Sequence, residues 1–393
     1  MRFPEDVPVL SDDVVTLRAH TAADVEPAYR MCQDPVMQEW TTIPVPYLRE
    51  HAVGYLTEVI PVPYLREHAV GYLTEVIPAG WQANTSWAWA IEYAGEYVGT
   101  IDLRDGEGGV GEVGFAVSPE VRGNGVMTRA LRLVVRYAFD VLDWKRVIWR
   151  AYAGNFASRR VAWKVGFHGL VTILGGGRSR GVRKDEWVAT VGRDDELEPK
   201  GNWWTVPVLE GDGFRLRPLR ESDAQRVQEA CGDERTQHWL SGMPSPYSLD
   251  DAKGFIGSRS DAAASGEAVA WAIADADTDE LLGNVSVFGL SGRMDKTRGE
   301  IGYWMHPEAR GRKVMTSAVQ LLIAYAFRPI EDGGLGRRRL LVRCADVNTA
   351  SAHVAEVNGF TKVGDERSAD PRRDGSYDNL LTYDLLAEDV LRG

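Results

Sequence analysis

A glycine-rich turn after an apolar strand is the segment whose residue types best fit a chemical function. Residues 118–131 read S-P-E-V-R-G-N-G-V-M-T-R-A-L and follow the alternating run Glu112–Val117. A strand that enters such a turn and then a helix presents unpaired backbone N–H groups and a positive dipole end, which bind phosphate or pyrophosphate. Gly123 and Gly125 let the backbone approach the anion closely. The turn is neither a Walker A loop nor a dinucleotide-binding G-x-G-x-x-G, and taken alone it equally fits an ordinary turn.

The surroundings of this turn resemble the GCN5-related N-acetyltransferase (GNAT) family, in particular the group that includes ribosomal-protein N-terminal acetyltransferases. The family's pyrophosphate loop has Gln or Arg, two variable residues, Gly, one variable residue and a final Gly or Ala. Residues 122–126 fit this pattern, although Met127 replaces the last small residue. The strand G-E-V-G-F-A-V before the loop is similar to the family's fourth strand. Residues 155–167, N-F-A-S-R-R-V-A-W-K-V-G-F, are similar to its segment after the fifth strand.

The resemblance implies acetyl-coenzyme A as donor and a sheet that opens between its fourth and fifth strands. Coenzyme A would lie in that opening, with its pantetheine on strand backbone, its pyrophosphate on the loop, and its arm held by Asn155. Backbone N–H groups at 116–117 would stabilise the oxyanion. The cofactor-binding residues implied are Ala116, Val117, Arg122, Gly123, Asn124, Gly125, Val126, Met127, Thr128 and Asn155.

Direct acetyl transfer also needs residues that move protons. The attacking amine must lose a proton from an ammonium with a pKa of about 10, so a carboxylate or a water relay acts as base. Glu112, on the strand beside the opening, is the candidate base, and Ser158 or a tyrosine is the candidate acid for the leaving thiolate. The alternatives are that Glu112 is a solvated strand residue and Ser158 a polar group at a helix start.

The chain consists of two divergent copies of one domain. Leu17-Arg18 matches Leu216-Arg217, and the strand, loop and helix motifs recur in the same order to Gly359-Phe360. The junction is rich in charge, proline and glycine and holds Trp203 and Trp204, which we expect to pack between the domains. The predicted domains are 1–195 and 206–393, with a linker at 196–205, and we expect them to pack on each other as a pseudo-dimer.

Each copy is predicted to be a mixed α+β domain. Alternating runs and capped helical runs predict a mostly antiparallel sheet of six or seven strands with about four helices. In the second copy Lys313 stands where the first has Gly125. Its side chain would restrict φ and crowd a pyrophosphate, although its charge, with that of Arg312, would favour one. We expect the first domain to be the better acetyl-CoA site.

A literal duplication interrupts the first copy. Residues 43–59 and 60–76 are identical letter for letter, unlike an architectural repeat, which conserves a pattern. Pro61 and Pro63 prevent the two copies from fusing into one straight helix. The extra copy is expected to form a short helix or a surface loop.

Composition narrows the function classes. The 393 residues are 44% apolar and carry a formal charge of −12, which disfavours a nucleic-acid binder. No apolar run is long enough to span a membrane, and neither the three cysteines nor the seven histidines show metal-ligand spacing. We expect a cytoplasmic enzyme without a metal that acetylates a primary amine. The alternative is a non-catalytic acyl-CoA sensor or partner-docking module.

Overall fold

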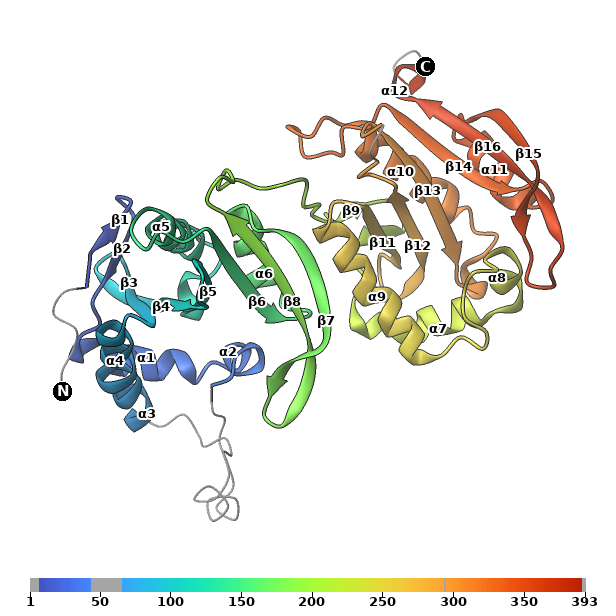
Figure 1. Cartoon of the computed structure of the whole chain (residues 1–393). Coiled ribbons are helices and arrows are strands. Elements are labelled where there is room, and N and C mark those ends of the chain that lie inside the picture. Colours follow the sequence, from blue (N-terminus) through green and yellow to red (C-terminus); the bar gives the residue numbers. More distant parts are fainter. Residues whose placement is uncertain (1–6, 44–65, 293–294, 391–393) are drawn as a thin grey trace, which may run out of the picture. The chain divides into compact units, whose positions relative to one another are not determined.

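The computed structural model describes residues 7–43, 66–292 and 295–390, which divide into two compact units, Met1–Lys200 and Gly201–Gly393 (Figure 1). Each unit contains one eight-stranded sheet with helices on both faces, a mixed α+β fold. The strand count exceeds the six or seven predicted, partly because a two-residue strand lies at one edge of each sheet: β1 (Leu10–Ser11) and β9 (Leu209–Glu210). Two residues are too few to show an alternating pattern.

The first sheet has the order β1-β2-β3-β4-β5-β6-β8-β7, and all neighbours are antiparallel except β5 and β6. Its other strands are β2 (Val15–Arg18), β3 (Ser86–Tyr93), β4 (Glu96–Asp105), β5 (Val110–Val117), β6 (Arg146–Tyr152), β7 (His168–Ser179) and β8 (Val182–Gly192). The helices of this unit are α1 (Val25–Cys32), α2 (Pro35–Trp40), α3 (Arg66–Gly71), α4 (Ile77–Ala83), α5 (Val126–Asp140) and α6 (Phe156–Lys164).

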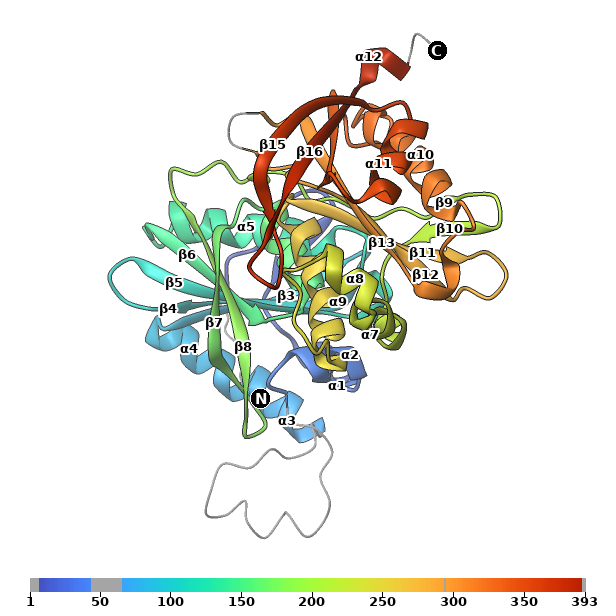
Figure 2. The same ribbon diagram turned by 90° about the vertical axis from the view of Figure 1, so that its right-hand side faces the viewer.

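The second sheet has the same order of equivalent strands, β9-β10-β11-β12-β13-β14-β16-β15, and its neighbouring strands are antiparallel except β13 and β14. Its strands are β10 (Phe214–Arg217), β11 (Ala268–Asp275), β12 (Leu281–Phe288), β13 (Arg298–Met305), β14 (Arg339–Ala345), β15 (Thr361–Pro371) and β16 (Tyr377–Leu386). The helices are α7 (Ala224–Gly232), α8 (Glu234–Trp239), α9 (Leu249–Ala264), α10 (Val314–Phe327), α11 (Thr349–Val357) and α12 (Ala387–Val390). Figure 2 shows the long hairpins β7–β8 and β15–β16.

Side-chain alternation along the first sheet gives it two different faces. Trp89, Ile101 and Leu103 point to one face and form the main core with α5, whose apolar stripe is fully buried. Small residues, Ala88 and Ala90, point to the other face, where α1, α3 and α4 pack closely. In Figure 1, α5 therefore lies on one side of this sheet and α1 and α4 on the other.

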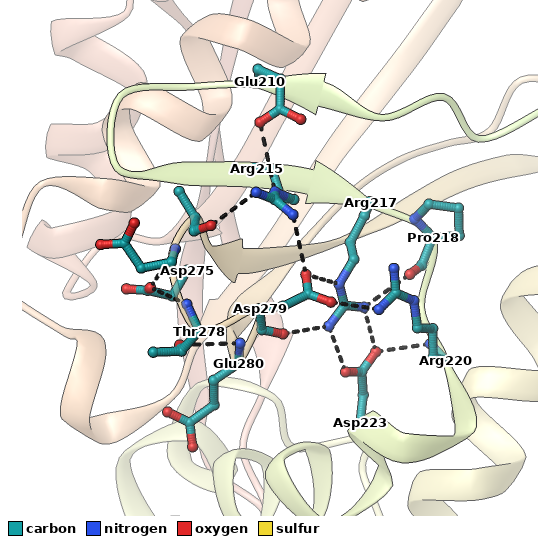
Figure 3. Close-up of polar contacts among 12 residues, drawn as sticks. Glu210, Arg215, Arg217, Pro218, Arg220, Asp223, Asp275, Thr278, Asp279 and Glu280 are labelled. Atoms are coloured by element: carbon teal, nitrogen blue, oxygen red, sulfur yellow. Dashed lines mark hydrogen bonds and ion pairs between the residues drawn. The ribbon is translucent and has the colours of Figure 1, made fainter.

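An arginine joins β2 or β10 to the helix that follows it in each unit, and the one in the second unit is fully buried. Arg217 is 2% exposed, and its guanidinium makes two contacts of 2.8 Å to Asp223, one of 2.9 Å to the Asp279 carboxylate, and two to the carbonyls of Pro218 and Asp279 (Figure 3). Five contacts match the five N–H groups of an arginine, so the buried charge is fully paired. Arg18 holds Asp24 and Glu92 in the same way in the first unit.

The second copy of the duplicated segment, and not an extra element outside the core, supplies the helix that covers the first sheet. Ala69, Leu73 and Ile77 are buried against α1 and the small-residue face. The helix runs from α3 through a π-helical turn, Tyr72–Val76, into α4. The first unit has one residue more than the second between Pro-Tyr and the next strand. A π turn accommodates one extra residue in a helix, whereas the equivalent α9 is uninterrupted. Residues 44–59 of the first copy, and with them the predicted short helix or surface loop, lie outside the described residues.

Gly80 of α4 packs closely against the first sheet. Gly80 is buried against β3, where an added Cβ would lie 2.0 Å from the Ser86 hydroxyl oxygen, so no larger residue fits without a shift.

Trp204 is buried in the core of the second unit and donates a 3.0 Å hydrogen bond to the Gly266 carbonyl. The expectation that Trp204 packs between the domains is therefore wrong, because its ring completes one core.

Candidate active site

Each sheet opens at its single parallel pair of strands. β5 and β6 pair from Val110 and Arg146 only as far as Val113 and Trp149, although β6 stays paired with β8 up to Tyr152. Residues Gly114–Val117 therefore have no strand partner on that edge among the described residues. The backbone groups of such an edge are available to an extended ligand with amides of its own. The second unit opens in the same way, beyond Glu300 and Leu341.

The loop from β5 to α5 places free N–H groups at the end of this opening. Gly123 and Gly125 have φ values of +85° and +78°, and a Cβ on either would meet no atom within 4 Å. Gly125 caps α5, whose first turn carries no acidic side chain. The backbone at 123–128 is thus open to an anion, as expected for a pyrophosphate loop. Val126 and Met127 are buried in the core, so only their backbone can contact a ligand.

Arg122 is held by a carboxylate of the neighbouring helix. Its guanidinium pairs with Asp34, which also caps α2 by accepting the Met37 N–H at 2.9 Å. Burial opposes the charge of Asp34, but the contacts with Arg122 and Met37 dominate and lower its pKa. Arg310 and Asp233 form the same pair in the second unit at 2.5 Å. The arginine therefore ties the loop to α2, which sequence reasoning missed because the two residues are far apart in the chain.

Glu112 lies on the face of β5 that is turned toward α1, in a row of acidic and basic side chains that alternate across the strands. Its two carboxylate oxygens contact Arg104 at 3.1 Å and Arg150 at 3.0 Å. Arg150 also pairs with Glu186 on β8 at 3.1 Å, and Glu300 pairs with Arg343 in the second unit. The predicted base thus has both oxygens engaged with guanidinium groups.

Asp102 continues this row on β4 and was not singled out from the sequence. It contacts the Arg104 Nε at 3.0 Å, and its side chain is 19% exposed. Burial raises the pKa of Asp102 to about 6, the nearby charge of Glu112 adds to this, and Arg104 opposes it. A comparison of the two halves would have found Asp102, because a charged residue stands in an apolar strand where the second half has the neutral Ser286.

Asn155 and Ser158 meet at the start of α6. The Asn155 side-chain oxygen accepts the Ser158 N–H at 3.1 Å and caps the helix. The Ser158 hydroxyl accepts a 3.0 Å hydrogen bond from the Trp149 indole. No acceptor for the Ser158 hydroxyl hydrogen occurs among the described residues, so that hydrogen is available to a ligand.

Side chains obstruct the corresponding opening of the second unit. The Tyr303 phenol on β13 donates to the Ser351 carbonyl at 3.2 Å and lies 3.0 Å from its hydroxyl. This contact joins the two sides of the opening, whereas the first unit has Phe115 at the equivalent position. Trp304 stands in place of Ala116 and is 8% exposed, with its ring 6.3 Å from Phe255.

Two further searches of the described residues bear on the site. No group of three or more histidine, cysteine or acidic residues is arranged to hold a metal ion within the described ranges. No helix found in the same part of the chain combines the length and apolar character that a membrane span requires.

Comparison with known proteins identifies relatives of both units. The model of the "Acetyltransferase (GNAT) domain" family matches residues 15–168 and 214–361. An uncharacterised N-acetyltransferase of Bacillus subtilis, YoaA, is 27% identical over 188 residues, which are 47% of this chain and 97% of that protein. The ribosomal-protein-serine acetyltransferase of Escherichia coli is 34% identical over 105 residues, 27% of this chain and 54% of its own. Mycobacterium smegmatis RimJ, solved with a coenzyme A disulfide, covers 45% of this chain and 83% of its own at 19% identity and a TM-score of 0.40.

Proposed function

The chain belongs to the GNAT acetyltransferase family, with one such domain in each unit, and we propose that its first unit transfers the acetyl group of acetyl-CoA to a primary amine. The observation that carries the proposal is the unpaired edge Gly114–Val117, which leads directly into a loop whose two glycines have open space above them. The second unit has the same frame but bridges its opening with Tyr303 and Ser351.

We assign the cofactor to residues of this opening. The N–H groups of the loop and the first turn of α5 bind the pyrophosphate, with Arg122 fixing the loop through Asp34. The edge at Ala116 and Val117 pairs with the pantetheine and donates to the thioester oxygen. Asn155 orders the start of α6, and the Ser158 hydroxyl protonates the departing thiolate.

A carboxylate must take the proton of the ammonium before the nitrogen attacks. Glu112 and Asp102 lie on the same face of the sheet beside the opening, and their contacts differ: Glu112 meets two arginines, and Asp102 meets one. The names of relatives that act on ribosomal proteins favour a protein N-terminus among the primary amines.

Calorimetry with acetyl-CoA and a coenzyme A release assay test this function on the full chain. We expect one acetyl-CoA site per chain and turnover with at least one primary amine. A panel of a serine-starting peptide, an alanine-starting peptide, spermidine and an aminoglycoside covers protein and small-molecule acceptors. Binding without turnover for the whole panel would favour the sensor or docking alternative. Packing of the two units as a pseudo-dimer stays a prediction, which small-angle scattering of the full chain tests.

A further inference from the structure

The carboxylate of Asp102 lies over a glycine at the point where the sheet opens. Asp102 on β4 pairs in register with Gly114 on β5, and Gly114 is the first residue of β5 beyond its pairing with β6. A Cβ built on Gly114 would lie 2.9 Å and 3.2 Å from the two Asp102 carboxylate oxygens. Glycine therefore leaves the space that this carboxylate occupies, and the carboxylate borders the unpaired edge.

The other carboxylate of this face is held more firmly by cations. Glu112 has one guanidinium on each oxygen, whereas Asp102 has a single contact, to the Nε of Arg104. Arg104 is half exposed and divided between the two acids. A carboxylate with two charge-assisted contacts is held in place more firmly than one with a single contact.

The helix above the carboxylate places a phenol near it. Tyr72, in the π turn, packs on the small-residue face that includes Ala88, the β3 partner of Asp102. Burial raises the pKa of Tyr72, and the charge of Asp102 raises it further, so the two side chains are within electrostatic reach of each other. Carboxylate, phenol and unpaired strand edge thus lie on the same face of the sheet, the face away from α5.

The second unit has uncharged residues at the positions of the carboxylate and the phenol, and a larger residue at the position of Ala116 on the strand edge. Ser286 replaces Asp102, Phe255 replaces Tyr72, and Trp304 replaces Ala116. The two aromatic rings pack together, and the Trp304 indole N–H has no hydrogen-bond partner among the described residues. The same position of the fold therefore holds a carboxylate and a phenol in one unit, and a serine and two packed aromatic rings in the other.

Building on the proposed function, we propose that Asp102 binds the ammonium of the acceptor and takes its proton, and that Glu112 positions Arg104 and Arg150. The ammonium gives one proton to the carboxylate, and the freed lone pair attacks the thioester carbon. The C–N bond forms and the C–S bond then breaks. The thiolate takes the hydroxyl hydrogen of Ser158, the second proton of the nitrogen restores the Ser158 hydroxyl, and Asp102 releases its proton to water.

The charges around Asp102 suit this role at neutral pH. The groups that face it are Arg104 on its own strand, Glu112 on β5 and Tyr72 on the covering helix, with Cys32 of α1 behind the tyrosine. With a pKa of about 6, mainly because of burial, Asp102 is ionised above that pH and yet accepts a proton more readily than an exposed aspartate.

Four variants of the full chain test the assignment, with the amine panel above as acceptor and coenzyme A release as readout. D102N should lower kcat by at least about 100-fold, within the range of general-base catalysis, and leave the Kd of acetyl-CoA within about twofold of wild type. It should also remove the rise in rate that is centred near pH 6. D102E should retain that rise and part of the rate. E112Q should lose less than about tenfold, and S286A, the matched position in the second unit, should behave as wild type.

The outcomes separate this proposal from the proposed function. A wild-type chain that acetylates no amine contradicts both. A wild-type chain that turns over while D102N keeps its rate, or while E112Q loses more than D102N, overturns Asp102 alone. If D102N does not fold, as judged by circular dichroism, the pH profile of D102E decides: loss of the rise near pH 6 in a folded D102E contradicts the assignment. The peptide and spermidine arms show whether the ammonium belongs to a protein or to a small molecule.

Discussion

The two openings of this chain share a backbone frame and differ in what fills it. In both units a short parallel pairing ends early, a loop arginine holds the N-cap residue of α2 or α8, and a glutamate pairs with an arginine across the strands. The side chains that border the opening differ: Phe115 against Tyr303, Ala116 against Trp304, and Asp102 against Ser286. The two units thus share backbone pairing and a few ion pairs, and differ in these three side chains.

The two loops show what their glycine contributes. Lys313 has a φ of +61°, close to the +78° of Gly125, so the second loop keeps its shape with a lysine. The expected restriction of φ costs on the order of 1 kcal/mol and does not change the conformation. What Gly125 provides is therefore the space next to the backbone, where a lysine side chain would lie.

The largest effect is expected when the first unit receives the second unit's aromatic ring. Ala116→Trp would place an indole against Met31, Cys32 and Met37, on the face of the sheet that carries Asp102. The indole would keep the acceptor away from the base. The rate of transfer should therefore fall at least about 100-fold, which is the contribution of general-base catalysis when the acceptor is in place. Steady-state kinetics measure the loss, and circular dichroism checks the fold. An active, folded variant would show that the ring in the second unit does not block acceptor entry.

Exchange of the loop residues gives a smaller effect. Gly125→Lys should weaken acetyl-CoA binding by at least tenfold, which corresponds to about 1.4 kcal/mol, because the side chain occupies the space next to the pyrophosphate. Lys313→Gly in the second unit is the matched control and should leave the measured site unchanged. Equal affinity of wild type and Gly125→Lys in calorimetry would mean that the loop sequence does not distinguish the two units.

The pH dependence of stability separates the two units through Asp102. Its pKa is raised to about 6, so the folded chain binds the proton more tightly than the unfolded chain. Stability from this group is present at low pH and is lost as the pH rises through 6. Between pH 5 and 7.5 wild type should therefore lose about 1 kcal/mol relative to D102N. Calorimetric scans at the two pH values measure this difference. S286A should show no such change, and a constant gap between wild type and D102N would contradict the raised pKa.

The smallest effect is expected from restoring the register of the second unit. Deleting residues 60–76 leaves one Pro-Tyr helix that leads directly to β3, as in the second unit. Because the two copies are identical, deletion of either gives the same chain, and that chain keeps every described residue that packs on the sheet. It should be as stable as the parent or slightly more so, since a redundant segment no longer has to be ordered. Side-by-side thermal unfolding decides this, and a clear loss of stability would make both copies integral.

Sequence patterns predicted those parts of the molecule that depend on local periodicity. The alternating run at 86–93 is β3, and the glycine-rich turn lies between β5 and α5. The opening of the sheet followed from the family resemblance and not from the pattern of β5 or β6. The Arg122–Asp34 pair, the bridge from Tyr303 to Ser351 and the position of Asp102 over Gly114 are contacts between distant segments, which periodicity does not show. The π turn was also missed, because one inserted residue leaves the apolar spacing of a helix almost unchanged.

Gly80 explains why one of two identical segments was selected for the core. Downstream of the duplication, the second copy continues into Ala79-Gly80-Trp81, whereas the first continues into Val62-Pro63-Tyr64. If the first copy lay in the groove, Pro63 would stand where an added Cβ meets Ser86 at 2.0 Å. The duplication therefore does not create two interchangeable ground states of the chain. A Gly80→Ala substitution would bring a Cβ against Ser86 in the selected arrangement, and would therefore reduce the advantage of the second copy over the first.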